Sequence, residues 1–305
     1  MLLRGQVRSH PGSASLLISR PVANPVGADL SAKVSVQATA VSVPIRVGKM
    51  NSRAICTLIL VLPLMALADT PPAPNPGKDP VQSVMGNFYY QKLLKGAPFV
   101  FDDNVILSAP PFAEDARQVP IEIDARAYKG DVVRILAWAE LNPLPQIVDF
   151  QPLDRVLPWL SIRIRIEQAT PLRAAVLTRD GLWHIGSTSI EAAGGGCTAP
   201  SVVRTQPGWE EHIGEVMGGR YAKAGFSRVR LQIAHPMDNG MVSGIPEFYL
   251  DQAQIKDASG KLLATLELFP AVSENPVLGF DIEGEGETQL SLRDISGNQF
   301  SAAVK

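Results

Sequence analysis

Several stretches of this chain alternate strictly between apolar and polar residues, and this pattern limits the possible folds more than any other feature. Val119–Ala125 reads VPIEIDA, and Leu160–Ile166 reads LSIRIRI. Side chains of a β-strand point to opposite faces in turn, so a period of two predicts a strand with one buried and one solvated face. An amphipathic helix would need a period of about 3.6 residues, which these stretches lack.

Turn residues separate further strand candidates. Asp180-Gly181 lies between Leu172–Thr178 and Leu182–Ala193, which predicts a β-hairpin. Gly and Pro contribute 25 residues each and aromatic residues only 6%, a composition that suits short strands joined by turns. The other predicted strands are Val133–Leu141, Ile147–Leu153, Val229–Ile233, Phe248–Lys256, Lys261–Leu268, Val277–Ile282, Gln289–Arg293 and Asn298–Val304. About seven strands in the first set and a similar second set predict an all-β fold of two immunoglobulin-like β-sandwich domains.

One amphipathic helix is expected before the first strands. Asp79-Pro80 resembles an N-cap followed by proline in the first turn, and Gly96 can end the helix. Its predicted buried face, with helical spacing, consists of Val81, Val84, Met85 and Phe88. A second, short helix is expected at Trp209–Met217, stopped by Gly218-Gly219.

The N-terminal region has the pattern of an export signal. Arg53 precedes the uncharged run Ala54–Ala68, which ends in the small-x-small sequence Ala66-Leu67-Ala68. This run of 15 residues is shorter than the about 20 that cross a bilayer, so no transmembrane segment is predicted. A buried core helix is the alternative interpretation. Residues 1–49 are interpreted as a disordered upstream mis-start before Met50, with an organellar transit peptide as the alternative.

These observations divide the chain into six segments. They are residues 1–49, the signal peptide 50–68, a Pro-rich tether 69–78, a first β domain 79–193, a Gly-rich loop and linker 194–226, and a second β domain 227–305. Without residues 1–68 the chain has 21 Lys and Arg against 29 Asp and Glu, a net charge of −8. This charge argues against nucleic-acid binding, and the signal peptide predicts a periplasmic protein.

The sequence contains no recognisable catalytic motif. It has no G-x-S-x-G elbow, no H-E-x-x-H and no phosphate-binding glycine loop. His184, His212 and His235 are not spaced like the ligands of a metal site. We therefore predict a protein that is not an enzyme, with no catalytic residue, no metal and no cofactor.

Cys197 is the one residue whose surroundings indicate chemistry. After signal cleavage removes Cys56, it is the only cysteine, and it follows Gly194-Gly195-Gly196. Three glycines allow a thiol to be presented on a thin, mobile segment, although an ordinary linker is the alternative. An ordinary thiol is only a few per cent ionised at neutral pH, which favours a group loaded by another enzyme over a catalytic nucleophile.

Longer motifs resemble two proteins of bacterial thiosulfate oxidation. HPMDNG (His235–Gly240), the following IPEFYLDQAQIKDASGK and PAVSENPVLGF (Pro270–Phe280) resemble SoxZ. NPLPQIVDF (Asn142–Phe150), RIRIEQATPLRAAV (Arg163–Val176) and the final GGGC resemble SoxY. A SoxY-like half followed by a SoxZ-like half is similar to the fused SoxYZ-like carriers associated with quinoprotein dehydrogenases.

The resemblance implies a sulfur carrier in which Cys197 holds an intermediate covalently on a flexible arm formed by Gly194, Gly195 and Gly196. Its implied partners are periplasmic oxidoreductases or sulfur-transfer enzymes, including a quinoprotein alcohol dehydrogenase. His235–Gly240 is expected to form a structural turn. In contrast to the free C-terminal arm of SoxY, Thr198-Ala199-Pro200 continue into the second half, so Cys197 is tethered at both ends and has a shorter reach.

Two other functions are compatible with the residues. The chain could be an accessory binding protein of a pyrroloquinoline-quinone-dependent dehydrogenase, in which the thiol is dispensable. It could also be a thiol-disulfide sensor whose Cys197 pairs with another thiol. Replacement of Cys197 by Ser would abolish function in a carrier or a sensor and preserve it in the accessory protein.

Overall fold

The structure is a computed structural model that describes residues 2–3 and 75–304. The predictions for the upstream segment 1–49, apart from Leu2–Leu3, for the signal peptide 50–68 and for the first part of the tether lie outside the described residues. None of the helices in the described ranges is long and apolar enough to cross a membrane.

The described chain is built almost entirely from β-strands, with one α-helix and three short 3-10 helices. The helix is α1 (Gly86–Leu94), and the 3-10 helices are η1 (Arg126–Tyr128), η2 (Val203–Thr205) and η3 (Trp209–His212). The strands up to residue 192 are β1 (Leu2–Leu3), β2 (Phe99–Phe101), β3 (Ile106–Ser108), β4 (Phe112–Ala113), β5 (Val119–Asp124), β6 (Val132–Ala139), β7 (Gln146–Pro152), β8 (Val156–Ile164), β9 (Thr170–Thr178) and β10 (Trp183–Ala192). The later strands are β11 (Val216–Lys223), β12 (Phe226–Ile233), β13 (Leu250–Asp257), β14 (Leu262–Leu268), β15 (Val277–Ile282), β16 (Thr288–Asp294) and β17 (Gln299–Val304).

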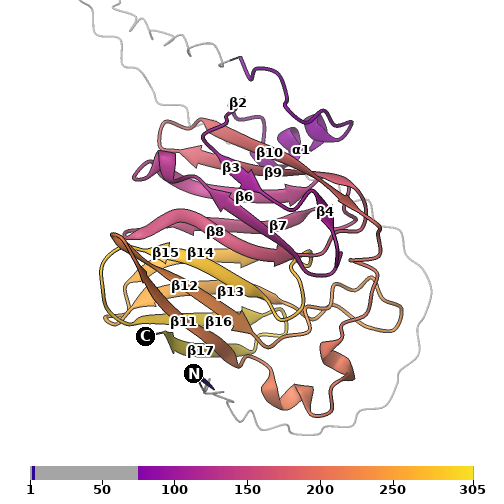
Figure 1. The fold of residues 1–305 in the computed structure, drawn as a ribbon, viewed down its shortest axis with the longest axis vertical. Coiled ribbons are helices and arrows are strands. Elements are labelled where there is room, and N and C mark those ends of the chain that lie inside the picture. Colours follow the sequence, from indigo (N-terminus) through magenta and orange to yellow (C-terminus); the bar gives the residue numbers. More distant parts are fainter. Residues whose placement is uncertain (1, 4–74, 305) are drawn as a thin grey trace, which may run out of the picture. The chain divides into compact units, whose positions relative to one another are not determined.

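The strands form two sheets that face each other, and each sheet contains strands from both halves of the chain (Figure 1). One sheet has the order β1-β11-β12-β15-β8-β5-β3, and the other has the order β17-β16-β13-β14-β7-β6-β9-β10-β2. The halves join where β15 pairs with β8 and β14 pairs with β7, both antiparallel. The fold-class prediction is confirmed. The two sandwiches lie side by side, and the strands at their adjoining edges are hydrogen-bonded to each other.

One hydrophobic core runs through both halves. It includes Ile123 and Phe150 from the first half and Leu266 and Phe280 from the second, all almost completely buried. The alternation in β5 appears directly in its burial, since every second side chain from Val119 onward faces this core. The predicted hairpins are also present, with Gly181, Gly260 and Gly297 in the left-handed region that their turns require.

The predicted helix is present, packs on a sheet and ends before Gly96 as expected, but its start and most of its predicted buried face were wrong. The helix α1 begins at Gly86 and buries Tyr89, Tyr90 and Leu94, whereas Val84 is 94% exposed and Phe88 is 52% exposed. The buried side chains meet Trp138 and Trp183 on the outer face of the sheet, where α1 forms a local third layer beside β9 and β10 (Figure 1).

A buried arginine explains why the helix starts late. Arg173 on β9 is fully buried and its guanidinium donates to the carboxylate of Asp79 at 2.6 and 2.9 Å and to Glu140 at 2.8 Å. Asp79 also accepts a hydrogen bond from the hydroxyl of Tyr90. Because this ion pair holds Asp79 against the sheet, Asp79 does not cap a helix.

The second predicted helix, Trp209–Met217, was wrong in most of its length. The structure has only the four-residue η3 there, and Met217, Gly218 and Gly219 belong to β11. Gly218 has a φ of 143° and lies so close to β12 that an added Cβ would be 2.0 Å from the carbonyl oxygen of Arg230. Gly218 therefore allows close strand pairing. Both β11 and β12 begin inside the range predicted to be loop and linker.

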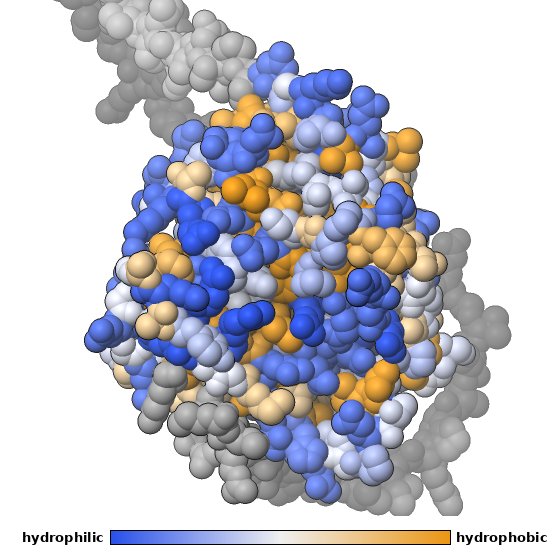
Figure 2. Space-filling view, in the orientation of Figure 1, coloured by the Kyte–Doolittle hydropathy of each residue, from blue (hydrophilic) through white to orange (hydrophobic). Residues whose placement is uncertain are grey.

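Hydrophobic side chains on the visible face are scattered among hydrophilic ones (Figure 2). Single exposed apolar residues of this kind are usual for a folded protein.

Candidate functional site

Cys197 lies in the segment that connects β10 with η2, and we call residues 194–200 the cysteine loop. Its side chain has 0% exposure, although Thr198 beside it is exposed. Cys197 is a free thiol. The sulfur therefore lies directly beneath a surface loop and is covered by that loop.

Glu167 holds the loop in this position. Its carboxylate accepts the backbone N–H of Cys197 at 2.9 Å and that of Thr198 at 3.2 Å. It also accepts the Thr198 hydroxyl at 3.1 Å. Glu167 lies in the short connection between β8 and β9, so one carboxylate ties two consecutive loop residues to the first half of the chain.

The glycines before Cys197 shape the loop for close packing. Gly194 and Gly195 have φ angles of 105° and 81°, a region that side chains rarely adopt. A Cβ on Gly196 would be 2.1 Å from the carbonyl oxygen of Ala116 and 2.4 Å from that of Ile166. The arm was expected to be mobile and to expose the thiol, whereas in the structure the glycines let the backbone pack so closely that the thiol is enclosed.

The second half of the chain supplies the other side of the enclosure. His235, Pro236, Met237, Asp238 and Asn239 are all buried. The amide of Asn239 donates to the carbonyl oxygen of Cys197 at 2.7 Å. The segment His235–Gly240 is irregular apart from a bridge between Asp238 and Phe248, and it contacts the cysteine loop directly, so the thiol lies where the two halves meet.

The surroundings of the sulfur favour the neutral thiol. Burial, together with the nearby carboxylate of Glu167, raises the pKa of Cys197 to about 12, while the charge of Arg165 acts in the opposite direction. The sulfur lies 3.8 Å from the carbonyl oxygen of Arg165, an acceptor that a thiol can use and a thiolate cannot. In this position the thiol is a poor nucleophile.

Arg165 is a buried cation close to the thiol. Its side chain is 3% exposed and donates one hydrogen bond, from Nη2 to the carbonyl oxygen of Pro236 at 3.2 Å. Burial lowers the pKa of Arg165, and the charges of Glu274 and Cys197 act in the opposite direction. The guanidinium therefore reduces the penalty for any negative charge that forms on the sulfur.

Glu274 anchors the chain just after the cysteine loop. Its carboxylate accepts the hydroxyl of Ser201 at 2.5 Å and the backbone N–H of Val202 at 2.7 Å. Glu167 thus holds Cys197 and Thr198, and Glu274 holds the chain that follows them.

The three histidines lie apart from the thiol's hydrogen bonds. His184 contacts Asp102 at 2.7 Å and Tyr128 at 3.0 Å, and His212 is exposed beside Glu215. His235 is buried, and burial lowers its pKa. Within residues 75–304 no group of three His, Cys, Asp or Glu side chains is arranged to hold a metal ion.

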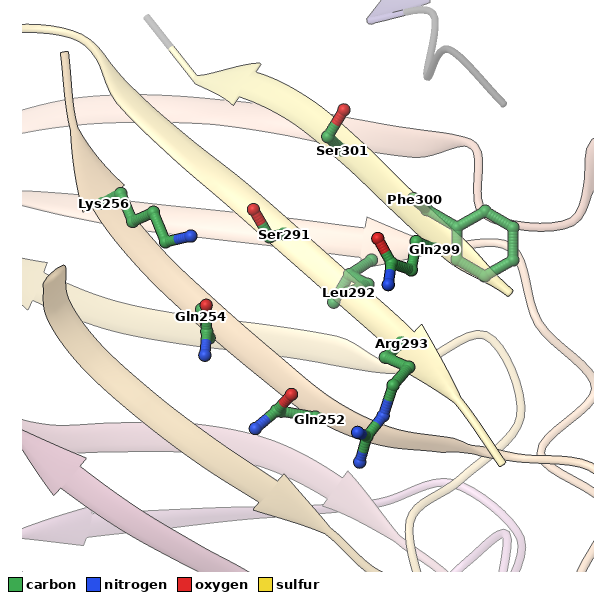
Figure 3. Close-up of a pocket in the computed structure, with 9 residues that line it drawn as sticks. All are labelled: Gln252, Gln254, Lys256, Ser291, Leu292, Arg293, Gln299, Phe300 and Ser301. Atoms are coloured by element: carbon green, nitrogen blue, oxygen red, sulfur yellow. The ribbon is translucent and has the colours of Figure 1, made fainter. Parts of the chain in front are cut away.

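A polar groove of about 520 Å³ crosses the outer face of β13, β16 and β17 (Figure 3). Arg293 in this groove pairs with Asp251. The groove is lined by Gln252, Gln254, Lys256, Ser291, Leu292, Arg293, Gln299, Phe300 and Ser301. It contains neither the cysteine nor a residue that contacts the cysteine loop, so we regard it as a solvated sheet face.

Sequence reasoning identified Cys197 and its glycines but missed Glu167 and Asn239. Glu167 is 30 positions before Cys197 and Asn239 is 42 positions after it. Both residues lie inside the quoted motifs RIRIEQATPLRAAV and HPMDNG. No spacing rule links them to the cysteine. The fold of the first half brings Glu167 to it, and the meeting of the two halves brings Asn239 to it.

Comparison with known proteins gives two family matches. The family described as "Sulfur oxidation protein SoxY" matches residues 90–197, and the family described as "Sulphur oxidation protein SoxZ" matches residues 218–305. Among solved structures the chain is similar to the sulfur carrier protein SoxY from Chlorobium limicola f thiosulfatophilum, with 19% identity and a TM-score of 0.32. That match covers 35% of this chain and 94% of the other. No curated protein sequence matches the chain.

Proposed function

The chain belongs to the family of fused SoxYZ-like carriers, since it has a SoxY domain followed by a SoxZ domain, and on this basis we propose that Cys197 holds a sulfur-containing intermediate covalently while partner enzymes act on it. The observation that carries this proposal is the position of the cysteine. The SoxY match ends on Cys197, and this residue occupies a surface loop at the junction of the two halves.

The proposed carrier leaves the chemistry to its partners. The hydrogen bond of the enclosed sulfur goes to a carbonyl oxygen, which is not a base that could take its proton, and burial favours the protonated thiol. A partner that loads Cys197 must therefore act on an opened loop and assist removal of the thiol proton. We infer that the partners are periplasmic oxidoreductases or sulfur-transfer enzymes, and that residues 50–68 direct export.

Intact-mass measurement tests this function. Protein isolated from the periplasm without reductant should carry a mass increment of added sulfur that maps to Cys197 and is removed by reductant. The Cys197→Ser variant should lack the increment, and the N-terminus should begin at Asp69. A thiol that stays unmodified while sulfur oxidation is active would contradict the carrier function.

Burial of the thiol favours one second candidate. A protonated, enclosed Cys197 also fits an accessory protein of a quinoprotein dehydrogenase that works by surface contact. In that case the Cys197→Ser variant would support dehydrogenase activity as well as the unchanged protein does, whereas a carrier would lose its function.

A further inference from the structure

The contacts of the cysteine loop hold it against the body of the protein from two sides. Glu167 of the first half accepts three donors from Cys197 and Thr198. Asn239 of the second half donates to the carbonyl oxygen of Cys197. Hydrogen bonds to a carboxylate are stronger than those between neutral groups, so Glu167 contributes most to holding the loop.

The loop in this position encloses the side chain of residue 197 completely. Cys197 has 0% exposure. The loop cannot move inward to make space, because the backbone at Gly196 already touches two carbonyl oxygens, those of Ala116 and Ile166. A group of several heavy atoms on the sulfur can be accommodated only if the loop moves outward, toward solvent.

The outward direction is open. Gly195 and Thr198 are exposed, and a Cβ on Gly195 would meet nothing within 4 Å. Glycines at 194 and 195 can change their backbone angles at little cost, which makes them suitable hinge residues. Outward movement breaks the hydrogen bonds to Glu167 and Asn239 but leaves both sheets unchanged.

We propose that the cysteine loop is a cover with two positions: closed over the empty thiol and held there by Glu167, and lifted whenever Cys197 carries a group of several heavy atoms. The inference rests on the proposed carrier function for the identity of that group, whereas the closed position and the role of Glu167 do not depend on it. A loading partner must lift the loop, while an unloading partner meets a group that is already exposed. The position of the loop thereby distinguishes empty from loaded carrier.

Alkylation of the folded full chain by iodoacetamide tests the role of Glu167. The reaction is followed on the peptide that contains Cys197 and compared with the same chain unfolded in urea. Wild-type Cys197 should react at least 10-fold more slowly when folded, and Glu167→Gln should react about 10-fold or more faster than wild type. The matched control is Glu191→Gln, which removes the same charge from an exposed side chain six positions before the cysteine and should leave the rate unchanged.

Two results would overturn the proposal. One is a wild-type thiol that reacts as fast folded as unfolded, and the other is a Glu167→Gln rate equal to that of the control. If Glu167→Gln does not fold, Asn239→Ala replaces it, with a smaller increase expected because the three hydrogen bonds to Glu167 remain.

Hydrogen exchange tests the lifted position directly. In the alkylated protein the backbone N–H groups of Cys197 and Thr198 should exchange at least 10-fold faster than in the free thiol form, because they no longer donate to Glu167. Unchanged exchange would mean that the loop stays closed over a modified sulfur. The mass measurement above is independent of this result. A missing sulfur increment would contradict the carrier, and unchanged alkylation and exchange would contradict the cover.

Discussion

Replacement of Gly196 by Ala should open the cysteine loop without disturbing either sheet. The added Cβ would be 2.1 Å from the carbonyl oxygen of Ala116 and 2.4 Å from that of Ile166, far inside van der Waals contact. Both obstacles are backbone atoms, and the N–H of Ile166 itself donates to the Ala116 carbonyl at 2.8 Å, so neither atom can easily move away. The loop, in contrast, has open space on its outer side.

The size of the effect follows from the cost of overpacking. Extra carbon atoms in a well-packed site cost about 1–3 kcal/mol, which corresponds to a roughly 5- to 150-fold change in an equilibrium constant. The upper part of this range is expected, since both overlaps involve backbone. The strain applies only to the closed loop, so the population of the lifted loop should rise by this factor.

The rate of Cys197 alkylation in the folded protein measures that population. Gly219→Ala is the control, because Gly219 lies in β11 with nothing within 4 Å of an added Cβ. The free energy of unfolding in urea should fall for Gly196→Ala by at most the same about 1–3 kcal/mol, because the strained closed loop is part of the folded state, and should change little for Gly219→Ala. An alkylation rate of Gly196→Ala equal to that of the control would refute the reasoning, because the loop would then tolerate the added carbon.

Four further predictions concern pH and buried charge. The alkylation rate of folded Cys197 should still rise between pH 9 and about pH 12, because the closed loop keeps the thiol protonated, whereas the rate in urea should level off near pH 9, the ordinary thiol pKa; a folded rate that also levels off near pH 9 would mean that the thiol is not enclosed. The folded thiol keeps its proton while the unfolded one loses it, so stability should fall as pH rises from about 9 to about 12, and Cys197→Ser should remove this fall in urea unfolding measured across that range. Arg173→Met leaves the carboxylate of Glu140 buried without its cation and should lower the free energy of unfolding by about 3–5 kcal/mol, against at most about 1 kcal/mol for Arg117→Met at an exposed ion pair. Glu274→Gln should weaken the anchor after the cysteine loop and lower the free energy of unfolding by about 1–3 kcal/mol, measured in the same way, and no change would mean that the amide replaces the carboxylate fully.

The strands were predictable because each buries one face, and burial of one face places an apolar residue at every second position. The helix was harder to place, since residues 81–94 offer two apolar stripes with helical spacing. One contains Val84 and Phe88, and the other contains Tyr89, Tyr90 and Leu94. The sheet surface around Trp138 and Trp183 selects the aromatic stripe, and the ion pair of Asp79 with Arg173 prevents an earlier start.

The joining of the halves was not visible in the sequence either. Apolar and polar residues alternate in the same way in two separate sandwiches and in two sandwiches that share their sheets. This is because the pairing of β7 with β14 uses backbone groups and not side chains. Residue patterns record which side chains are buried and carry little information about which strand edges pair.

For the functional site, local residue types and motif resemblance were enough to identify Cys197, its glycines and the order of a SoxY-like half before a SoxZ-like half. They could not establish whether the glycines expose or enclose the thiol, since glycine permits both. The tertiary structure decided this, because the fold of the first half brings Glu167 to the cysteine loop and the joining of the two halves brings Asn239 to it. The enclosure depends on contacts between residues far apart in the chain, whereas a sequence pattern reports on neighbours.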